Sequence, residues 1–387
     1  ISNIESRHEE KVREGNERVI RPRFADAEFF WNQDRKQRLD SHLEQLKTVV
    51  FQHQLGTLYD KTRRMTKLAE FIAAQLGADK QQAFRAAELS KCDLLTEMVG
   101  EFPNLQGVMG RYYAQHDGEP SAVAAAIDQH YCPRFSGDVL PQGPISQAVA
   151  LADRIDTLIG IFAIGQLPTG DKDPYALRRA ALGVLRTMIE GSLDLDLHQL
   201  LSLAAQHFDA KVKADNAVEA VMEFILDRLR AYYQEQGIRA DVLDAVTALK
   251  PVRPVDIDKR IQAVNVFRQL PEAESLASAN KRSGNILKKI EGTLPATIKP
   301  ELLTEAAEQR LYQALTELTD QVKPMLADGN YEPALQQLAD LRQPVDTFFD
   351  DVMVMVDDMQ LRDNRIALLN QLHGLFLEVA DISRLHN

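Results

Sequence analysis

Apolar residues recur at helical spacing along almost the whole chain, and this periodicity constrains the fold more than any other feature. The apolar residues from Leu39 to Val50 are separated by 4, 3 and 4 residues, and those from Leu311 to Val322 repeat these intervals. Such spacing places each set on one face of a helix. Beyond the first residues of the chain, no convincing run of strands interrupts this pattern. The sequence therefore predicts an all-α fold.

The chain is long enough for more than one domain. It has 387 residues, whereas single domains cluster at about 100–200 residues. We predict three helical blocks, 22–190, 191–275 and 276–387, of which the last is an antiparallel helix bundle with short turns. The segment 1–21 is interpreted as the remnant of a truncated N-terminal region, because the chain starts at Ile1 without a methionine.

Charge and cysteine content exclude several classes of protein. A formal net charge of −12 excludes a surface that is basic throughout, but it leaves room for one basic face. Cys92 and Cys132 are too few for a disulfide framework and indicate a reducing compartment. No apolar run approaches the ~20 residues that span a bilayer, and no signal peptide is present. We expect a cytoplasmic protein without membrane contact.

The segment GQLPTGDKDPYALRR joins a turn rich in glycine and proline to a helix. It fails the phosphate-binding P-loop pattern, because Asp171 stands where that loop needs a lysine. A carboxylate there would repel a phosphate. We predict that Asp173 caps the helix and that Pro174 lies in its first turn. Because adjacent side chains cannot both face the core, Arg178 or Arg179 is available for a carboxylate or a phosphate.

A divalent-metal site is a weaker hypothesis. His116 and Asp117 form a His-Asp pair, but they lie in a turn, where polar surface residues are common. The side chains of His130, Asp153 and Asp156 are of types that bind divalent cations. Their sequence spacing does not bring them together, and a hydrogen-bonded, half-buried histidine is the simpler interpretation of His130.

Two clusters of lysine and arginine suit phosphate binding, because neutralising phosphates releases counterions. The first cluster comprises Lys61, Arg63, Arg64 and Lys67, and the second comprises Lys281, Arg282, Lys288 and Lys289. For the first cluster, a solvated helix face and a phosphate contact both stay open. The second contains no acidic residue and favours nucleic acid.

Near the C-terminal end, an aromatic pair and a polar trio are candidates for contact with bases. Phe348 and Phe349 lie in an apolar run, and we interpret them as core rather than as a stacking platform. Arg362, Asn364 and Arg365 combine charge with an amide at a helix start, and such groups read base edges and phosphates. Helix capping and pairing within the helix remain the alternative for this trio.

Five segments carry a family likeness. They are SNIESRHEEKVREGNERVIRPRFADAEFFWNQD, LSKCDLLTEMVGEFPNLQGVMGRYYA, ADRIDTLIGIFAIGQLPTGDKDPYALRRAALGVLR, VDIDKRIQAVNVF and PVDTFFDDVMVMVDDMQLRDNRIALL. Together they resemble the β subunit of bacterial tetrameric glycyl-tRNA synthetase. The likeness extends over the whole chain, and it corresponds to the C-terminal portion of such a β subunit.

The resemblance implies a division of labour within glycine–tRNA ligase. The separate α subunit activates glycine with ATP and Mg²⁺, while the β subunit holds and positions tRNA(Gly) in an assembly of two α and two β chains. We therefore expect this chain to be part of an enzyme but to contain no aminoacylation site, catalytic residue, metal or cofactor of its own.

The resemblance also implies a role for each block. Block 22–190 resembles an HD-type helical domain, block 191–275 a helical linker or body region, and block 276–387 an anticodon-binding bundle. A working HD centre needs a His-Asp doublet, and Lys91 and Cys92 stand in its place. We predict a degenerate HD domain with too few ligands for a metal to activate water.

The function predicted from the sequence is tRNA binding, chiefly by the last block. The residues assigned to backbone phosphates are Lys281, Arg282, Lys288 and Lys289, and those assigned to the region of the anticodon bases are Arg362, Asn364 and Arg365. Contacts to the α subunit or to tRNA are assigned to Lys172, Arg178 and Arg179. Two alternatives remain: an HD-type metal-dependent phosphohydrolase, which predicts bound metal, and a helical scaffold, which predicts no affinity for tRNA.

Overall fold

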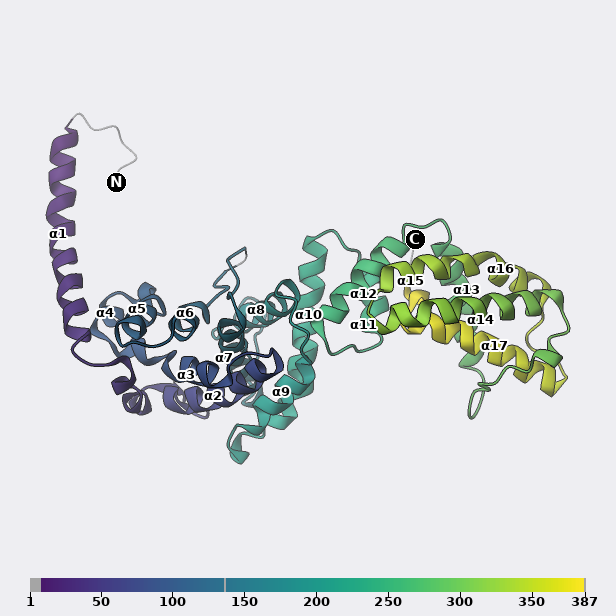
Figure 1. The fold of residues 1–387 in the computed structure, drawn as a ribbon, viewed down its shortest axis with the longest axis horizontal. Coiled ribbons are helices and arrows are strands. Elements are labelled where there is room, and N and C mark those ends of the chain that lie inside the picture. The colour runs from purple at the N-terminus through teal and green to yellow at the C-terminus, as the bar shows by residue number, and fades with distance from the viewer. Residues whose placement is uncertain (1–7, 136, 386–387) are drawn as a thin grey trace. The chain divides into compact units, whose positions relative to one another are not determined.

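The computed structural model describes residues 8–135 and 137–385, and this part of the chain is built almost entirely of helices (Figure 1). It divides into two compact units. Of the described residues, unit 1 contains 8–135, 137–193 and 198–225, and unit 2 contains 194–197 and 226–385. The strands in the described part are one short antiparallel pair, β1 and β2. The all-α prediction is confirmed.

Unit 1 begins with a long helix and continues through short helices and the β1–β2 hairpin. Its elements are α1 (Glu9–Asp34), η1 (Leu39–His42), η2 (Glu44–Thr48), β1 (Val50–Gln52), β2 (Gly56–Thr57), α2 (Leu58–Gln75), α3 (Lys80–Leu89), η3 (Cys92–Leu95), α4 (Glu97–Glu101), η4 (Pro103–Leu105), α5 (Val108–His116), α6 (Ser121–Gln129), α7 (Pro144–Ala163), α8 (Leu177–Glu190), α9 (Leu197–Gln206), η5 (Ala210–Val212), η6 (Ala214–Ala217) and α10 (Val218–Glu235). The last of these runs on into unit 2.

The core of unit 1 forms around α7. This helix packs against α2, α3, α6, α8 and η6, and 14 of its 20 residues are buried. A helix that is apolar on nearly all sides lies in the interior of a domain. The polar residues of α7, including Asp153 and Asp156, therefore face other elements of unit 1 rather than open water.

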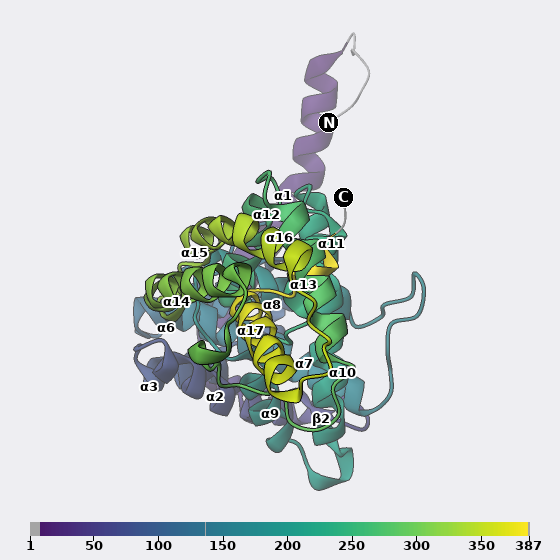
Figure 2. The same ribbon diagram turned by 90° about the vertical axis from the view of Figure 1, so that its right-hand side faces the viewer.

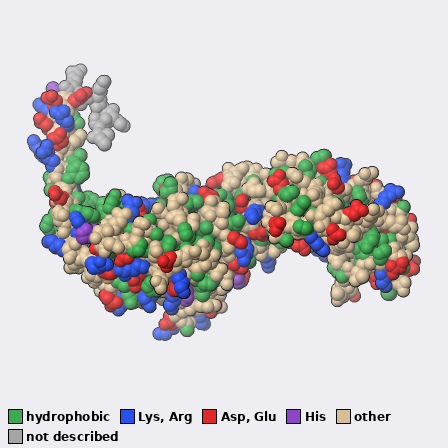
Figure 3. Space-filling view, viewed as in Figure 1, with side chains coloured by type: hydrophobic (Ala, Val, Ile, Leu, Met, Phe, Trp, Pro, Cys, Tyr) green, Lys and Arg blue, Asp and Glu red, His purple; other side chains and the backbone are tan. Residues whose placement is uncertain are grey.

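By contrast, α1 is exposed along its length, and none of its residues is buried. Figure 3 shows acidic, basic and apolar side chains mixed along it. Its C-terminal residue fixes it to the body of unit 1. The Asp34 carboxylate accepts the backbone N–H groups of Glu97 and Met98 at 2.9 and 3.0 Å. The Tyr113 hydroxyl donates to the same carboxylate at 2.7 Å. Asp34 therefore caps α4 from a distance in sequence.

Unit 2 continues from α10 as a set of packed helices. Its further elements are α11 (Ala240–Thr247), α12 (Pro254–Phe267), α13 (Ala273–Leu287), η7 (Pro300–Leu302), α14 (Ala306–Ala327), α15 (Tyr331–Leu338), η8 (Ala339–Leu341), α16 (Arg342–Asp351), α17 (Met359–Leu377) and η9 (Ile382–Arg384). Figure 2 shows α17 between α13 and α14, and α17 packs against both.

The helix face predicted between Leu311 and Val322 is confirmed. Both residues lie in α14 and are fully buried, as is Leu315 between them. The chain after α14 turns at Asp328 to Asn330 and re-enters a helix at Tyr331. After α15 the chain passes through η8, and α16 follows it directly at Arg342.

The helix predicted between Leu39 and Val50 is wrong. The segment forms the short 3-10 helices η1 and η2 and then enters β1, where Val50 pairs with Thr57. The Asp117 carboxylate accepts the N–H of Leu39 at 2.6 Å. Leu39 and Leu46 are still buried. Contacts with distant residues therefore override the local helical spacing here.

The two units do not follow the three predicted blocks. α1 continues through Pro22, the block 191–275 divides between the units, and α13 already begins at Ala273. The functional meaning of the three blocks stays a prediction. Across the described residues, no helix combines the length and the apolar character needed to cross a membrane.

Candidate nucleic-acid interface

The α13 helix presents one buried face and one cationic face. Leu276, Ser283 and Leu287 are buried against the rest of unit 2. The cations predicted for phosphate contact, Lys281, Arg282, Lys288 and Lys289, are all exposed. Lys288 and Lys289 directly follow the helix, where positive charges interact favourably with the negative end of its dipole. The structure thus places these four cations on the surface of α13 and of the two residues that follow it.

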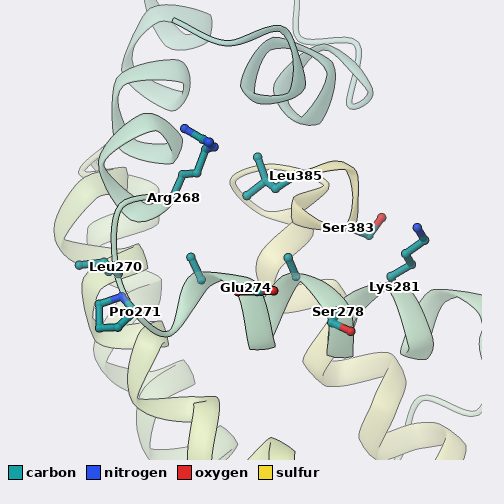
Figure 4. Close-up of a pocket in the computed structure, with 10 residues that line it drawn as sticks. Arg268, Leu270, Pro271, Glu274, Ser278, Lys281, Ser383 and Leu385 are labelled. Atoms are coloured by element: carbon teal, nitrogen blue, oxygen red, sulfur yellow. The ribbon is translucent and has the colours of Figure 1, made fainter. Parts of the chain in front are cut away.

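Lys281 borders a hollow of about 390 Å³ between α12, α13 and η9. Figure 4 shows the Lys281 side chain beside Ser383, with Arg268 and Glu274 on the other walls. One acidic and two basic side chains line this hollow, so it is a polar recess and not an apolar binding pocket. We interpret it as the edge of the cationic face of α13.

Arg282 is oriented by an aromatic ring. Its guanidinium lies 4.5 Å from the centroid of the Phe349 ring, a cation–π geometry that favours a fixed position. Phe348 is fully buried, as predicted, whereas Phe349 is half-buried. Phe349 therefore supports Arg282 at the surface instead of filling the core.

Two residues of the trio predicted to contact bases have their side chains engaged inside unit 2. The Asn364 side chain accepts the N–H of Lys299 at 2.7 Å and donates to its carbonyl at 3.1 Å. The buried Arg365 guanidinium pairs with the fully buried carboxylate of Glu308 and donates to the Met353 carbonyl at 2.7 Å. Both side chains therefore hold unit 2 together, and the structure gives their predicted contact with tRNA no support.

Arg362, the third member of the trio, is half-buried in the first turns of α17. Asp358 caps this helix by accepting the N–H groups of Gln360 and Leu361 at 2.9 and 3.1 Å. The carboxylates of Asp363, which follows Arg362, and of Asp358, four residues before it, weaken the local positive potential. Arg362 stays a candidate contact, but a weaker one than the cations of α13.

The loop before α8 keeps its helix-capping residue but not the predicted helix start. The Asp173 carboxylate accepts the N–H groups of Leu177 and Arg178 at 2.8 and 2.9 Å, as a capping side chain should. The helix begins at Leu177, so Pro174 lies in the preceding turn and its predicted place in the helix is wrong. Ala176, which lies between Pro174 and the first helical residue Leu177, has a φ of +53° and ends the turn.

The cations of this loop divide into two groups. Arg178 donates to the Gly170 carbonyl at 2.5 Å and so braces the turn. Lys172 and Arg179 are exposed. Lys172 also pairs through its backbone with Thr169, which closes the turn. Lys172 and Arg179 therefore remain available for a partner, while Arg178 mainly shapes the loop.

Replacing Asp173 with alanine is expected to lower the free energy of unfolding of unit 1 by about 1 kcal/mol, because two N–H groups lose their acceptor. Urea unfolding followed by the fluorescence of Trp31, the single tryptophan of the sequence, measures the effect. Asp171→Ala, an exposed neighbour, should change the value by less than about 0.5 kcal/mol. Equal losses in both variants would contradict the capping role.

The residues considered for an HD-type metal site meet in unit 1, but cations of the protein occupy the centre. The Lys91 ammonium lies 2.8 Å from His130 Nε2 and 3.1 Å from Asp153 Oδ2. The Lys61 ammonium lies 3.0 Å from Asp153 Oδ1 and 3.1 Å from Asp156 Oδ2. All five side chains are buried or nearly so. Two ammonium groups thus stand where ligands would surround a metal ion.

The protonation states in this cluster follow from its geometry. An ammonium has only donors, so His130 Nε2 must accept from Lys91 while Nδ1–H donates to the Ile127 carbonyl at 2.7 Å. Burial, then the Lys91 charge, lowers the pKa of His130 well below its usual value. Burial alone would raise the pKa of Asp153, but Lys61 and Lys91 outweigh it and hold that pKa well below its usual value. The geometry therefore favours a neutral imidazole and an ionised carboxylate, while burial also lowers the pKa of Lys91.

This arrangement gives the phosphohydrolase hypothesis no support. Nowhere in the described part of the chain do three or more His, Cys, Asp or Glu side chains form a group that could hold a metal ion. His116 and Asp117 lie elsewhere, at the end of α5, where Asp117 accepts the Leu39 N–H. The residues do not fit a metal, so no chemical step is assigned to this centre.

The first predicted basic cluster divides between core and surface. Lys61 and Arg64 are buried, and Arg64 donates to the Asp156 carboxylate at 2.6 and 3.2 Å. A phosphate contact for these two residues is therefore wrong, because both are buried and paired with Asp153 and Asp156. Arg63 and Lys67 lie on the exposed face of α2 and remain free to contact a phosphate.

Comparison with known proteins decides the family. The sequence profile described as glycyl-tRNA synthetase beta subunit matches residues 1–248. The chain belongs to the glycyl-tRNA synthetase beta subunit family. A second profile, the DALR anticodon binding domain, matches residues 276–380 and so covers α13 to α17 of this beta-subunit chain. The family resemblance seen in the sequence is confirmed.

Curated relatives agree along the full length of this beta-subunit chain. It is 55% identical over 385 residues to the glycine–tRNA ligase beta subunit of Aeromonas hydrophila, which covers 100% of this chain and 56% of the relative. The beta subunits of Pseudomonas putida and Vibrio campbellii are 54% and 53% identical over the same length. The chain thus spans about half the length of the curated relatives it matches.

Proposed function

We propose that this chain is the part of a glycine–tRNA ligase beta subunit that holds tRNA(Gly), with unit 2 gripping the anticodon arm. The match of residues 276–380 to an anticodon binding domain supports this function. The exposed cations of α13 lie within that region and supply the charge that a phosphate backbone needs.

The same proposal assigns the chemistry to other chains. Glycine activation with ATP and Mg²⁺ belongs to a separate α subunit, in an assembly of two α and two β chains, and no residue of this chain is assigned a catalytic role. Lys172 and Arg179, exposed before and within α8, are the candidate contacts to the α subunit or to tRNA.

The observation that carries the proposal is the unpaired charge on α13. Among the described residues, no carboxylate lies within ion-pair distance of Lys281, Arg282, Lys288 or Lys289, although acidic residues outnumber basic ones in the chain by 57 to 45. Basic side chains left without partners on an acidic protein indicate a surface that meets an anion.

Replacing Lys288 and Lys289 together with glutamate is expected to weaken the binding of tRNA(Gly). If each lysine contacts one phosphate, the slope of log affinity against log salt concentration should fall by about 2. Filter binding of the 387-residue chain to tRNA(Gly) at several salt concentrations measures both the affinity and the slope.

The matched control reverses the same number of charges elsewhere in unit 2. Lys259 and Lys323 are exposed on α12 and α14, and Lys259→Glu with Lys323→Glu should leave the salt slope near that of the unmodified chain. An unchanged affinity after Lys288→Glu with Lys289→Glu would remove the phosphate role. Equal losses in both pairs would point to net charge alone.

A further inference from the structure

Unit 1 contains two adjoining hollows of about 520 and 540 Å³ beside α2, α7 and the segment that follows α9. Gln54, Lys211 and Val212 line both, so one wall is shared. Each volume is within the ~300–1,000 Å³ typical of sites for small ligands. The two hollows differ in chemistry, since one is polar and cationic and the other has an apolar floor.

The first hollow, called here the cationic hollow, is bordered by Arg63, Lys67 and Lys211. Within the described part of the chain, no carboxylate lies within ion-pair distance of these three side chains. Asp60 and Asp209 also line this hollow, but each accepts a nearby backbone N–H, at 2.8 and 2.9 Å. The cationic hollow thus has three cationic side chains without an ion-pair partner. Its two carboxylates each accept a hydrogen bond from a nearby backbone N–H group.

The wall of the cationic hollow that contains Phe208 is closely packed. The Arg64 guanidinium lies 4.2 Å from the centroid of the Phe208 ring. The Phe208 ring packs so closely on α7 that a Cβ at Gly160 would come within 3.0 Å of it. Gly160 therefore permits the contact that holds the segment bearing His207 and Lys211 in place.

His207 offers an unused polar atom in this wall. Its Nδ1 is buried and has no hydrogen-bond partner, although an orphaned buried polar atom costs free energy. Burial, followed by the charge of Lys67, lowers the pKa of His207. A bound anion would offset the positive charge of Lys67 next to the ring.

The second hollow, called here the apolar hollow, is floored by Phe162, Ile164 and Leu167, and Lys213 stands at its edge. The Phe162 ring is held in place by Phe224, with the ring centroids 5.1 Å apart. Leu167 is 49% exposed and has apolar surface to cover. Aromatic and apolar surfaces next to a cationic strip are the arrangement on which unstacked bases bind.

We propose that the joined hollows bind one nucleotide of single-stranded RNA, with its phosphate against Arg63, Lys67 and Lys211 and its base against Phe162 and Leu167. The apolar hollow is the reason to assign a nucleotide rather than a free phosphate compound. A single strand fits best, because a base inside a duplex would first have to be unpaired and unstacked to reach the floor. Under the proposed function, on which the identity of the RNA rests, this is a second contact with tRNA, outside the anticodon-binding region.

Fluorescence anisotropy of a labelled four-nucleotide oligoadenylate with the 387-residue chain tests the site. Replacing Arg63 and Lys67 together with alanine is expected to weaken binding about tenfold at low salt, since two phosphate contacts are lost. Phe162→Leu keeps an apolar side chain but removes the stacking face, and should weaken binding about fivefold or more. Binding should also shift the imidazole nitrogen signals of His207 in NMR spectra.

The control for the double variant is Lys36→Ala with Lys80→Ala, which removes two exposed cations of unit 1 that do not line either hollow. Equal affinities in the two double variants, or no binding of the oligonucleotide to the unmodified chain, would overturn the proposal. Equal binding of a duplex of the same length, or inorganic phosphate competing as well per phosphate as the oligonucleotide, would overturn the assignment to an unstacked nucleotide.

The test is separate from that of the anticodon-binding region. The loss of oligoadenylate affinity caused by Arg63→Ala with Lys67→Ala should be the same in the unmodified chain and in a chain that already carries Lys288→Glu with Lys289→Glu, because the two pairs lie on different surfaces. Loss of tRNA affinity in Lys288→Glu with Lys289→Glu, together with a further loss of oligonucleotide affinity on adding Arg63→Ala with Lys67→Ala, would support both assignments. Absence of oligonucleotide binding with normal dependence of tRNA affinity on Lys288 and Lys289 would overturn only the nucleotide site.

Discussion

Replacing Asp153 with alanine is expected to lower the free energy of unfolding of unit 1 by about 3–5 kcal/mol, because a buried ion pair that loses one partner leaves an uncompensated charge. Asp153 is the carboxylate shared by Lys61 and Lys91, which lie 3.0 and 3.1 Å from its oxygens. Both ammonium groups are almost fully buried. Urea unfolding followed by Trp31 fluorescence measures the loss, since the Trp31 ring stacks on Tyr113 inside unit 1.

Two further variants separate the ion pair from simple truncation. Asp26→Ala, on the exposed surface of α1, should cost less than about 0.5 kcal/mol. Adding Lys91→Met to Asp153→Ala removes one stranded ammonium and should recover part of the loss, which a double-mutant cycle quantifies. A loss in Asp153→Ala as small as that in Asp26→Ala would show that the cluster is dispensable.

The Asp153 carboxylate should also make the free energy of unfolding of unit 1 depend on pH. The pKa of Asp153 in the folded chain lies well below its usual value of 3.8. A carboxyl group of this kind contributes stability that is fully present above the unfolded pKa and is lost as the pH falls through the folded pKa. Asp153→Asn should therefore be less stable than the unmodified chain at neutral pH, and the difference should shrink as the solution is acidified below pH 3.8.

Replacing Glu308 with alanine should destabilise unit 2 by a similar amount, about 3–5 kcal/mol, for the same reason. Glu308 is fully buried and is the carboxylate partner of the buried Arg365. The sole tryptophan lies in unit 1, so amide hydrogen exchange of α14 and α17, followed by mass spectrometry, is the suitable measurement. Both helices should lose protection in the variant.

A control and a compensating pair make this result specific. Glu317→Ala alters an exposed glutamate of the same helix, whose contact is with Gln313, and should change protection little. Glu308→Leu with Arg365→Met replaces both charges by apolar side chains and should restore much of the protection. Protection that stays normal in Glu308→Ala would contradict the role assigned to the pair.

Local patterns in the sequence predicted structure well when both partners lie close together in the chain. The apolar face from Leu311 to Val322 belongs to one helix, and Asp173 caps residues that follow it directly. Neither prediction needs knowledge of the rest of the fold. The family likeness was also readable, because it is spread over segments along the entire chain.

Side chains whose partners are distant could not be interpreted in this way. Asn364 and Arg365 bind residues 65 and 57 positions away, and Lys61 binds Asp156 at a separation of 95. A charged or amide residue at a helix start has the same local pattern whether it faces a nucleic acid or a buried carboxylate. Only the packing of the helices decides between the two.

The cationic and apolar hollows were missed for the same reason. Their walls come from α2, α7 and the segment after α9, which are far apart in the chain. The basic cluster at 61–67 already contained Arg63 and Lys67 of the cationic hollow, and a second signal was the pair of lysines flanking Val212, in a short segment between two helices. Exposed lysines on both sides of a half-buried valine indicate a loop held against the body of the unit with its charges outward.

The attachment of α1 gives one carboxylate a mechanical role. A helix of 26 residues extends for about 39 Å at 1.5 Å per residue, and Asp34 ties its final residue to α4 and Tyr113. A force applied at the N-terminal end of α1 would act on the contacts of Asp34 with a long moment arm. The position of the helix therefore depends on the three hydrogen bonds that Asp34 accepts, on the Arg23–Glu101 ion pair at 2.7 Å and on the stacking of Trp31 on Tyr113.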